Sequence, residues 1–229
     1  MVQNNKEQLI KNLIDDGYLK TPSIIEAFQK IDRADFVPED IRESAYLNTP
    51  LPIGHGQTIS QPLVVAFMLE LLEPKSGEKI LDIGAGSGWA AALLACVVGE
   101  DGRVVAIERI PELKMMAEHN IAKYNFIDPV SNGAGKGIAK VILGDGSKGY
   151  KDEAPYDKII AAAALPSRLP AGRQMHEAIP DAWKEQLKIG GRIVAPVGQS
   201  IIMIEKNEAT KFSQKQYFGF SFVPLVTNK

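Results

Sequence analysis

The chain has 229 residues, of which 45% are hydrophobic and 24% are charged, and its formal net charge is −2. This length suits one domain with a full hydrophobic core, and the composition is typical of a globular protein. A net charge near zero gives no electrostatic reason to expect a nucleic acid or an anionic membrane as partner, because both favour clusters of Lys and Arg. The single cysteine, Cys96, excludes an intrachain disulfide and suits a reducing compartment.

The N-terminal residues 1–17 carry charges throughout and contain no apolar stretch of the signal-peptide type. The longest apolar run, Trp89–Val98, is far shorter than the ~20 residues that a membrane-spanning helix needs. We therefore expect a cytoplasmic monomer that binds neither a membrane nor a nucleic acid.

Residues 1–75 are predicted to form an all-helical, loop-rich cap. Apolar side chains recur at helical spacing in three stretches, which end at Gly17, at about Ile31 and near Pro74. The third helix opens at Gln61-Pro62, since proline is favoured in the first turn of a helix.

Residues 76–229 show strands that alternate with helices, which predicts an α/β fold of the Rossmann-like type. The sheet is expected to be mostly parallel with helices on both faces. Strands are predicted over Lys79–Ile83, Arg103–Glu108, Lys140–Leu143, Tyr156–Ala161 and Arg192–Ala195. Helices are predicted over Gly88–Val98, Pro111–Tyr124 and Ile179–Leu187, the last followed by a turn at Lys188–Gly191.

The C-terminal tail contains two β-like runs, Ser200–Glu205 and Lys215–Leu225, which predict an antiparallel hairpin added to the sheet edge. Two stretches, 127–137 and 167–176, read as surface insertions. The whole chain is thus expected to be a single domain, with the cap 1–75 packed on the α/β core 76–229.

The segment Leu81–Gly88 (LDIGAGSG) lies where the first predicted strand ends and a helix begins. Its glycines let the backbone turn tightly and let a ligand approach, at the end of the sheet where ligands of α/β folds bind. Such a turn alone is a weak signal, because a plain strand-to-helix connection reads the same.

Two acids at the ends of the next strands make a nucleotide-like cofactor the better interpretation. Glu108 is placed to accept the hydroxyls of a ribose, and Asp145 to meet an adenine amino group. The candidate cofactor residues are Ile59, Asp82, Gly84, Ala85, Gly86, Ser87, Gly88, Glu108, Arg109, Gly144, Asp145 and Gly146.

The spacing of the glycines distinguishes between two cofactors. Dinucleotide-binding turns read G-x-G-x-x-G, because the helix N-terminus must face a pyrophosphate. Here the spacing is G-x-G-x-G and an acid, Asp82, precedes it. That acid would repel a pyrophosphate but suits the cationic methionine end of S-adenosylmethionine. The sequence therefore favours S-adenosylmethionine, with S-adenosylhomocysteine as product, over NAD.

The polar segment Gly56–Pro62 (GQTISQP) is the remaining candidate for substrate binding. Ser60 precedes a helix that begins with proline, so its simplest role is that of an N-cap. Its hydroxyl could also donate to a substrate carboxylate near the start of that helix.

Several motifs resemble those of protein-L-isoaspartate O-methyltransferases. They are PLPIGHGQTISQP (50–62), LDIGAGSG (81–88), GDGSKGY (144–150) with APYD after it, QLKIGG (186–191), PVG (196–198) and FVPL (222–225). The likeness covers roughly residues 20–225 in consistent order. It implies methylation of the α-carboxyl of L-isoaspartyl residues in damaged proteins, followed by collapse of the ester to a succinimide. The implied partners are proteins and peptides that contain isoaspartate.

The resemblance also implies roles for individual residues. Ser60 would be the active-site serine, Thr58 and Ile59 would line the site, and Phe222–Pro224 (Phe222, Val223 and Pro224) would hold the substrate backbone. No general base is required, because a free α-carboxyl with a pKa of about 3.3–3.7 is already ionised at neutral pH. The three histidines do not suggest a metal site.

Two other functions stay open at this point. One is a methyltransferase that acts on a different nucleophile, such as a tRNA base, although the weakly acidic charge disfavours RNA binding. The other is a module that binds S-adenosylmethionine without turnover, against which the joint presence of Ser60, Glu108 and Asp145 argues.

Overall fold

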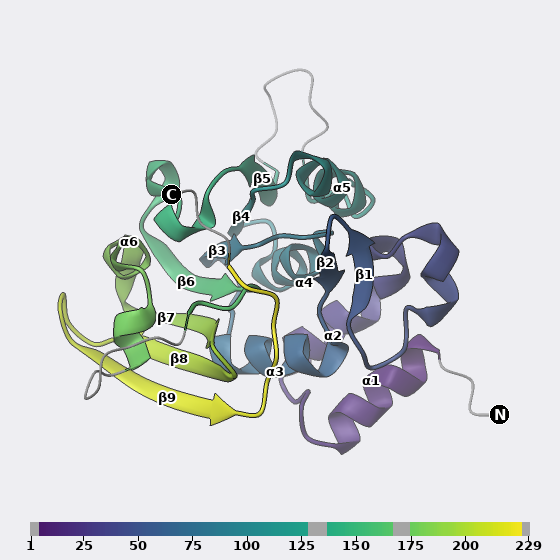
Figure 1. Ribbon diagram of the computed structural model, residues 1–229, viewed down its shortest axis with the longest axis horizontal. Coiled ribbons are helices and arrows are strands. Elements are labelled where there is room, and N and C mark those ends of the chain that lie inside the picture. The colour runs from purple at the N-terminus through teal and green to yellow at the C-terminus, as the bar shows by residue number, and fades with distance from the viewer. Residues whose placement is uncertain (1–4, 128–136, 167–174, 226–229) are drawn as a thin grey trace.

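A computed structural model (Figure 1) describes residues 5–127, 137–166 and 175–225. Seven strands form one sheet in the order β5-β4-β3-β6-β7-β8-β9. The first five strands of this order run parallel, and β8 and β9 are antiparallel to their neighbours. The strands are β3 (Lys79–Ile83), β4 (Arg103–Glu108), β5 (Ala139–Leu143), β6 (Tyr156–Ala161), β7 (Leu187–Val197), β8 (Ser200–Lys206) and β9 (Phe212–Phe218).

The sheet separates two hydrophobic clusters, because successive side chains of a strand point to opposite faces. In β3, Ile80 contributes to one cluster and Leu81 to the other, and both are fully buried. The first cluster contains residues of the α-helices described before β5, which are α1 (Lys6–Asp15), α2 (Pro22–Lys30), α3 (Pro62–Leu72), α4 (Trp89–Val98) and α5 (Pro111–Ala122). The Rossmann-like fold with helices on both faces is confirmed.

The other face is covered by a single short α-helix within the described residues, α6 (Asp181–Gln186). Its Trp183 is fully buried, and the indole Nε1 donates to the carbonyl of Gly146 at 2.8 Å. This contact fixes α6 beside the chain that leaves β5. The helix is shorter than the predicted Ile179–Leu187, because Pro180 precedes it and Leu187 already pairs with Tyr156 as the first residue of β7.

The expectation of an all-helical cap is wrong, because residues 51–59 form a β-hairpin. Strand β1 (Leu51–Gly54) pairs with β2 (Gln57–Ile59), and two turn residues, His55 and Gly56, connect them. Both have positive φ (53° and 70°), as type I′ hairpin turns require. The rest of the cap contains the 3₁₀ helices η1 (Arg33–Phe36) and η2 (Glu39–Ser44).

Two predictions in the C-terminal half are corrected. The predicted turn Lys188–Gly191 lies inside β7, where the register jumps from the pair Tyr156–Leu187 to the pair Lys158–Arg192. The extra residues bulge out of the strand, with Gly190 at a φ of 79°.

The last strand also differs from the prediction. The hairpin β8–β9 is confirmed, but β9 ends at Phe218 and not at Leu225. Residues 220–225 instead leave the sheet and pass over its carboxyl end, where Ala164 N–H donates to Val223 O and Leu225 N–H donates to Ala164 O. We call residues 220–225 the C-terminal strap.

Both predicted insertions fall largely outside the described residues. None of the helices in the described ranges is long and apolar enough to cross a membrane. The cap and the sheet share one hydrophobic cluster, to which Phe28 of α2 and Ile80 of β3 both belong.

Candidate functional site

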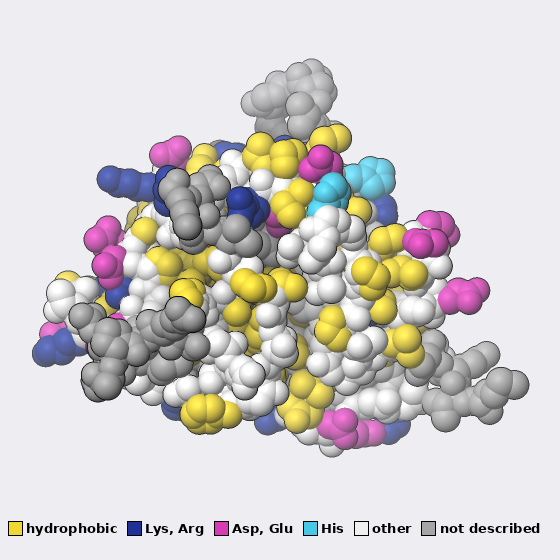
Figure 2. All heavy atoms as spheres, viewed as in Figure 1, with side chains coloured by type: hydrophobic (Ala, Val, Ile, Leu, Met, Phe, Trp, Pro, Cys, Tyr) yellow, Lys and Arg dark blue, Asp and Glu magenta, His cyan; other side chains and the backbone are white. Residues whose placement is uncertain are grey.

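Three adjoining cavities lie at the carboxyl ends of β3, β4 and β6, where the strand order reverses between β3 and β6. Figure 2 shows hydrophobic side chains in the middle of this face and most of the charged ones toward its margin. Thr58, Ser60 and Ala162 line all three cavities. These residues therefore mark the junction at which the cavities meet.

We name the cavities after one residue that lines each. The Glu108 cavity is also lined by Gly84, Gly86, Arg109, Gly144 and Gly146. The Asp82 cavity is also lined by Ile59, Ala85, Ser87 and Trp89. The Phe222 groove is also lined by Pro50, Gln61, Val223 and Pro224.

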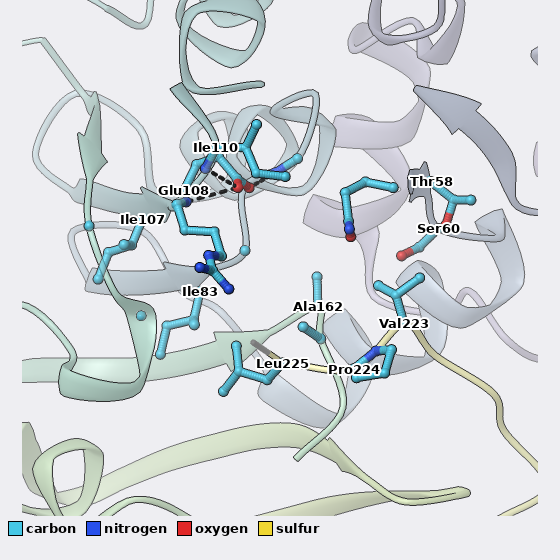
Figure 3. Close-up of a pocket in the computed structure, with 17 residues that line it drawn as sticks. Thr58, Ser60, Ile83, Ile107, Glu108, Ile110, Ala162, Val223, Pro224 and Leu225 are labelled. Carbon is cyan, nitrogen blue, oxygen red and sulfur yellow. Dashed lines mark hydrogen bonds between the residues drawn. The ribbon is translucent and has the colours of Figure 1, made fainter. Parts of the chain in front are cut away.

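The carboxylate of Glu108 holds the glycine turn (Figure 3). Its Oε2 accepts from Gly86 N–H at 2.9 Å, and its Oε1 accepts from Arg109 N–H at 2.8 Å and Ile110 N–H at 3.0 Å. A carboxylate has about four acceptor positions, so Oε2 keeps one for a ligand. Because Glu108 is only 6% exposed, a hydroxyl bonded to this position would be shielded from water.

Asp82, the last residue but one of β3, is a buried acid that forms no salt bridge with any described residue. It is 1% exposed, and its Oδ2 has no hydrogen-bond partner among the described residues. Burial, with a smaller contribution from the charge of Glu108, raises the pKa of Asp82 to about 7. An orphaned carboxylate oxygen beside a cavity suits a cationic ligand group, which would supply the missing partner.

Ser87 adds a second orphaned group beside Asp82. Its hydroxyl is buried and unpartnered among the described residues, and Ser87 lines the same cavity. Both groups fit a ligand that carries a positive charge together with hydrogen-bonding atoms.

Two predicted cofactor residues do not line any of these cavities. Asp145 accepts from both the N–H and the hydroxyl of Ser147 through Oδ1, at 3.0 and 2.7 Å, and so caps a short 3₁₀ turn, η3 (Gly146–Lys148). Gly88 faces α5: a Cβ there would lie 3.1 Å from the Cα of Ala117, so helix packing accounts for this glycine. Their proposed contacts with a cofactor stay predictions.

Ser60 is not the N-cap of α3, contrary to its simplest sequence interpretation. The helix begins at Pro62 with Gln61 as its N-cap residue, and Leu63 N–H donates to Asn48 Oδ1 at 3.0 Å. The side chain of Asn48 thus satisfies a donor of the helix start. The Ser60 hydroxyl has no hydrogen bond to any described residue and is available where the three cavities join.

The fold brings the remaining predicted substrate residues to the same place from distant segments of the chain. The hairpin carries Thr58 and Ile59 to the cavities, and the C-terminal strap carries Phe222, Val223 and Pro224. Figure 3 shows Thr58 and Ser60 facing Val223 and Pro224 across the opening.

Several lining residues were missed by the sequence reasoning. Ala162 and Ala163 follow β6 directly, and Ile83 and Ile107 stand at or next to the ends of β3 and β4. Their positions at strand ends were a usable signal. Leu225 had no such signal, because only the path of the strap brings it to the Glu108 cavity. Within the described ranges, no group of three or more potential metal ligands is assembled.

Comparisons with known proteins agree with this geometry. The model of the family "Protein-L-isoaspartate(D-aspartate) O-methyltransferase" matches residues 4–229. A protein-L-isoaspartate O-methyltransferase of Methanopyrus kandleri is 43% identical over 225 residues, which cover 96% of this chain and 91% of the relative. Protein-L-isoaspartate O-methyltransferase 2 of Archaeoglobus fulgidus is 44% identical over 223 residues, which cover 96% and 92%.

Solved structures give the same result for the fold. A protein-L-isoaspartate O-methyltransferase matches with a TM-score of 0.77 and 25% identity, over 96% of this chain and 65% of that one. A putative protein-L-isoaspartate O-methyltransferase of Plasmodium falciparum, in complex with S-adenosyl-L-homocysteine, matches with a TM-score of 0.76 and 22% identity, over 98% and 99% of the two chains.

The raised pKa of Asp82 predicts a stability change with a defined sign. In the unfolded chain this carboxyl ionises near pH 4, so the ligand-free folded state becomes less stable as the pH rises from about 4 to 7. Asp82→Asn removes the buried charge. We expect its free energy of unfolding at pH 7.5, measured in urea, to exceed that of the wild type by on the order of 1–3 kcal/mol, and by less at pH 5.

Asp157→Asn is the matched control. Burial opposes ionisation of Asp157, but the Lys188 ammonium and the Lys79 N–H outweigh it and lower its pKa. This variant should lose stability at pH 7.5, and the loss should vanish in acid. A gain for Asp82→Asn that is equal at both pH values, or a loss at pH 7.5, would contradict the assignment.

Proposed function

The chain belongs to the protein-L-isoaspartate(D-aspartate) O-methyltransferase family, and we propose that it methylates the α-carboxyl of L-isoaspartyl residues in damaged proteins with S-adenosylmethionine. One observation supports this most strongly. The cavity that contains the buried Asp82 and the groove proposed for a peptide meet at Ser60; neither Asp82 Oδ2 nor the Ser60 hydroxyl has a hydrogen-bond partner in the described ranges. A cationic methyl donor and a carboxylate substrate can thus be brought together there.

The proposed cofactor fits the two inner cavities. Asp82 would bind the cationic methionine end, and the free acceptor position of Glu108 Oε2 would bind a ribose hydroxyl. Gly84, Ala85, Gly86, Ser87, Gly144 and Gly146, together with Arg109, would form the walls. When bound, S-adenosylmethionine supplies an electrophilic methyl group.

The chain's own contribution to the reaction is to bind and orient the substrate carboxylate. This group is ionised at pH 7, so the protein needs no base to activate it. The Ser60 hydroxyl would donate to one carboxylate oxygen and leave the other to face the methyl donor. Because such a bond slightly lowers the nucleophilicity of the carboxylate, its benefit comes from orientation.

The Phe222 groove is the proposed site of the substrate chain. Thr58 and Ser60 form one wall of it, and Phe222, Val223 and Pro224 of the strap form the other. After methyl transfer the substrate's following backbone nitrogen would attack the ester, methanol would leave, and the resulting succinimide would reopen partly to normal aspartate.

The setting of the reaction is part of the proposal. We propose one methyltransferase domain over residues 1–229 that acts as a cytoplasmic monomer on isoaspartyl proteins. The hydrophobic cluster shared by cap and sheet supports the single domain.

The first test compares two peptides that differ only in L-isoaspartate against L-aspartate. Both peptides are incubated with the protein and radiolabelled S-adenosylmethionine. The isoaspartyl peptide alone should acquire base-labile methyl ester, because only in isoaspartate is the α-carboxyl of the aspartyl residue not part of a peptide bond. Equal labelling of both peptides, or labelling of neither, would overturn the proposed function.

The second test concerns Ser60. Ser60→Ala should lower kcat/KM for the isoaspartyl peptide by roughly 10–150-fold, since a charge-assisted hydrogen bond contributes about 1.5–3 kcal/mol. Ser76→Ala is the control, because Ser76 is an exposed serine just before β3, at the other end of the sheet. An unchanged kcat/KM in Ser60→Ala would refute the role of this hydroxyl.

A further inference from the structure

A buried guanidinium lies behind the substrate segment. Arg33, in η1, is only 2% exposed, and its Nη1 and Nη2 atoms donate to four backbone carbonyls. Nη1 donates to Ala45 O and, at 3.4 Å, to Leu47 O, while Nη2 donates to Thr49 O at 3.0 Å and to Ser60 O at 3.1 Å.

This charge has no carboxylate partner among the described residues. The nearby acid Asp32 is engaged elsewhere: its carboxylate accepts from Tyr46 Oη and from Ala34 N–H. Burial therefore lowers the pKa of Arg33 to about 10, which still leaves it charged at neutral pH. A buried charge without an ion pair costs stability, so its presence calls for a reason beyond packing.

The guanidinium also lies against Trp89, a residue on the cofactor side of the site. Its Cζ lies 5.3 Å from the ring centroid of Trp89, a cation–π distance. Trp89 is the first residue of α4, directly after the glycine turn, and it lines the Asp82 cavity together with Ser60. Arg33 thus touches both the segment that carries Ser60 and the residue that follows the cofactor turn.

The backbone around Ser60 is held from a second direction as well. Gln61 Nε2 donates to Asn48 O at 3.0 Å, and Asn48 Oδ1 accepts from Leu63 N–H. The segment 45–49 is therefore bonded to the start of α3 on one side and to Arg33 on the other. With its carbonyl bound to Arg33, Ser60 has a fixed backbone and a hydroxyl that keeps its hydrogen-bonding capacity for a ligand.

We propose that Arg33 is a positioning residue, whose guanidinium fixes Ser60 relative to Trp89 and the glycine turn so that the Ser60 hydroxyl meets the substrate carboxylate in line with the methyl donor. This role rests on the proposed function. Lysine cannot replace it, because one ammonium is a compact point donor and cannot span four carbonyls while stacking on an indole.

A double-mutant cycle of Arg33→Lys with Ser60→Ala tests this role. If Arg33 acts through Ser60, Arg33→Lys should lower kcat/KM for the isoaspartyl peptide by about 30-fold in the wild-type background but by less than about 3-fold in Ser60→Ala, because coupled residues are not additive. The Kd for S-adenosylmethionine should change by less than about 3-fold, which also shows that the variant is folded.

Two results would overturn the role of Arg33. One is a loss of similar size in both backgrounds, and the other is a weakening of S-adenosylmethionine binding that parallels the loss of kcat/KM. Arg192→Lys is the matched control, since Arg192 is half-buried at the far end of the sheet, bonded to Leu71 O and paired with Glu73 and Glu205. It should leave kcat/KM within about 2-fold in both backgrounds.

A second variant and the wild type distinguish a folding defect and a wrong function from a wrong role of Arg33. If Arg33→Lys does not fold, Arg33→Gln keeps N–H donors without a buried charge and enters the same cycle with the same expected pattern. The wild type in the same assay tests the proposed function separately. A wild type without isoaspartyl-dependent methylation refutes the function, whereas an active wild type with independent losses refutes the role of Arg33 alone.

Discussion

The contact between Glu108 and the glycine turn is the constraint on which the site depends. The turn leaves β3 without side chains to anchor it, so the end of β4 holds it instead. Gly84 and Ala85 donate to Ile107 O, and Gly86 donates to the Glu108 carboxylate. The turn is thereby fixed to the sheet before any ligand binds. The direction of α4, and with it the position of Trp89, follows from this attachment.

Two buried charges flank this turn, and the described residues compensate them to different extents. Among the residues that the structure describes, Oδ2 of Asp82 has no hydrogen-bond partner, at a cost in stability that a cationic ligand would offset. The guanidinium of Arg33 is bonded to backbone carbonyls and packs on Trp89. The charge of Asp82 thus remains for a ligand, whereas the charge of Arg33 orders the chain around Ser60. Both cost stability, which is common where a site is organised for function.

The parts of the structure that could be predicted from sequence are those set by local pattern. The parallel strands are short and mostly apolar, and their predicted bounds placed Asp82 and Glu108 at the carboxyl ends of β3 and β4, where the structure has them. The hairpin at 51–59 was missed because His-Gly is not one of the usual turn pairs, such as Asn-Gly. The N-cap role predicted for Ser60 was wrong because Leu63 N–H at the start of α3 donates to Asn48, which only the fold brings near. No sequence pattern indicated the role of Arg33, since its partners are backbone carbonyls, which every residue supplies.

In the proposed function, one junction orients a substrate carboxylate toward a methyl donor. A crystal structure of the protein with S-adenosylhomocysteine and an isoaspartyl peptide tests it most directly. We expect the peptide in the Phe222 groove, with Ser60 Oγ about 2.5–3.0 Å from one oxygen of the α-carboxylate and the other oxygen facing the sulfur. A peptide bound elsewhere, or a carboxylate turned away from both Ser60 and the sulfur, would contradict it.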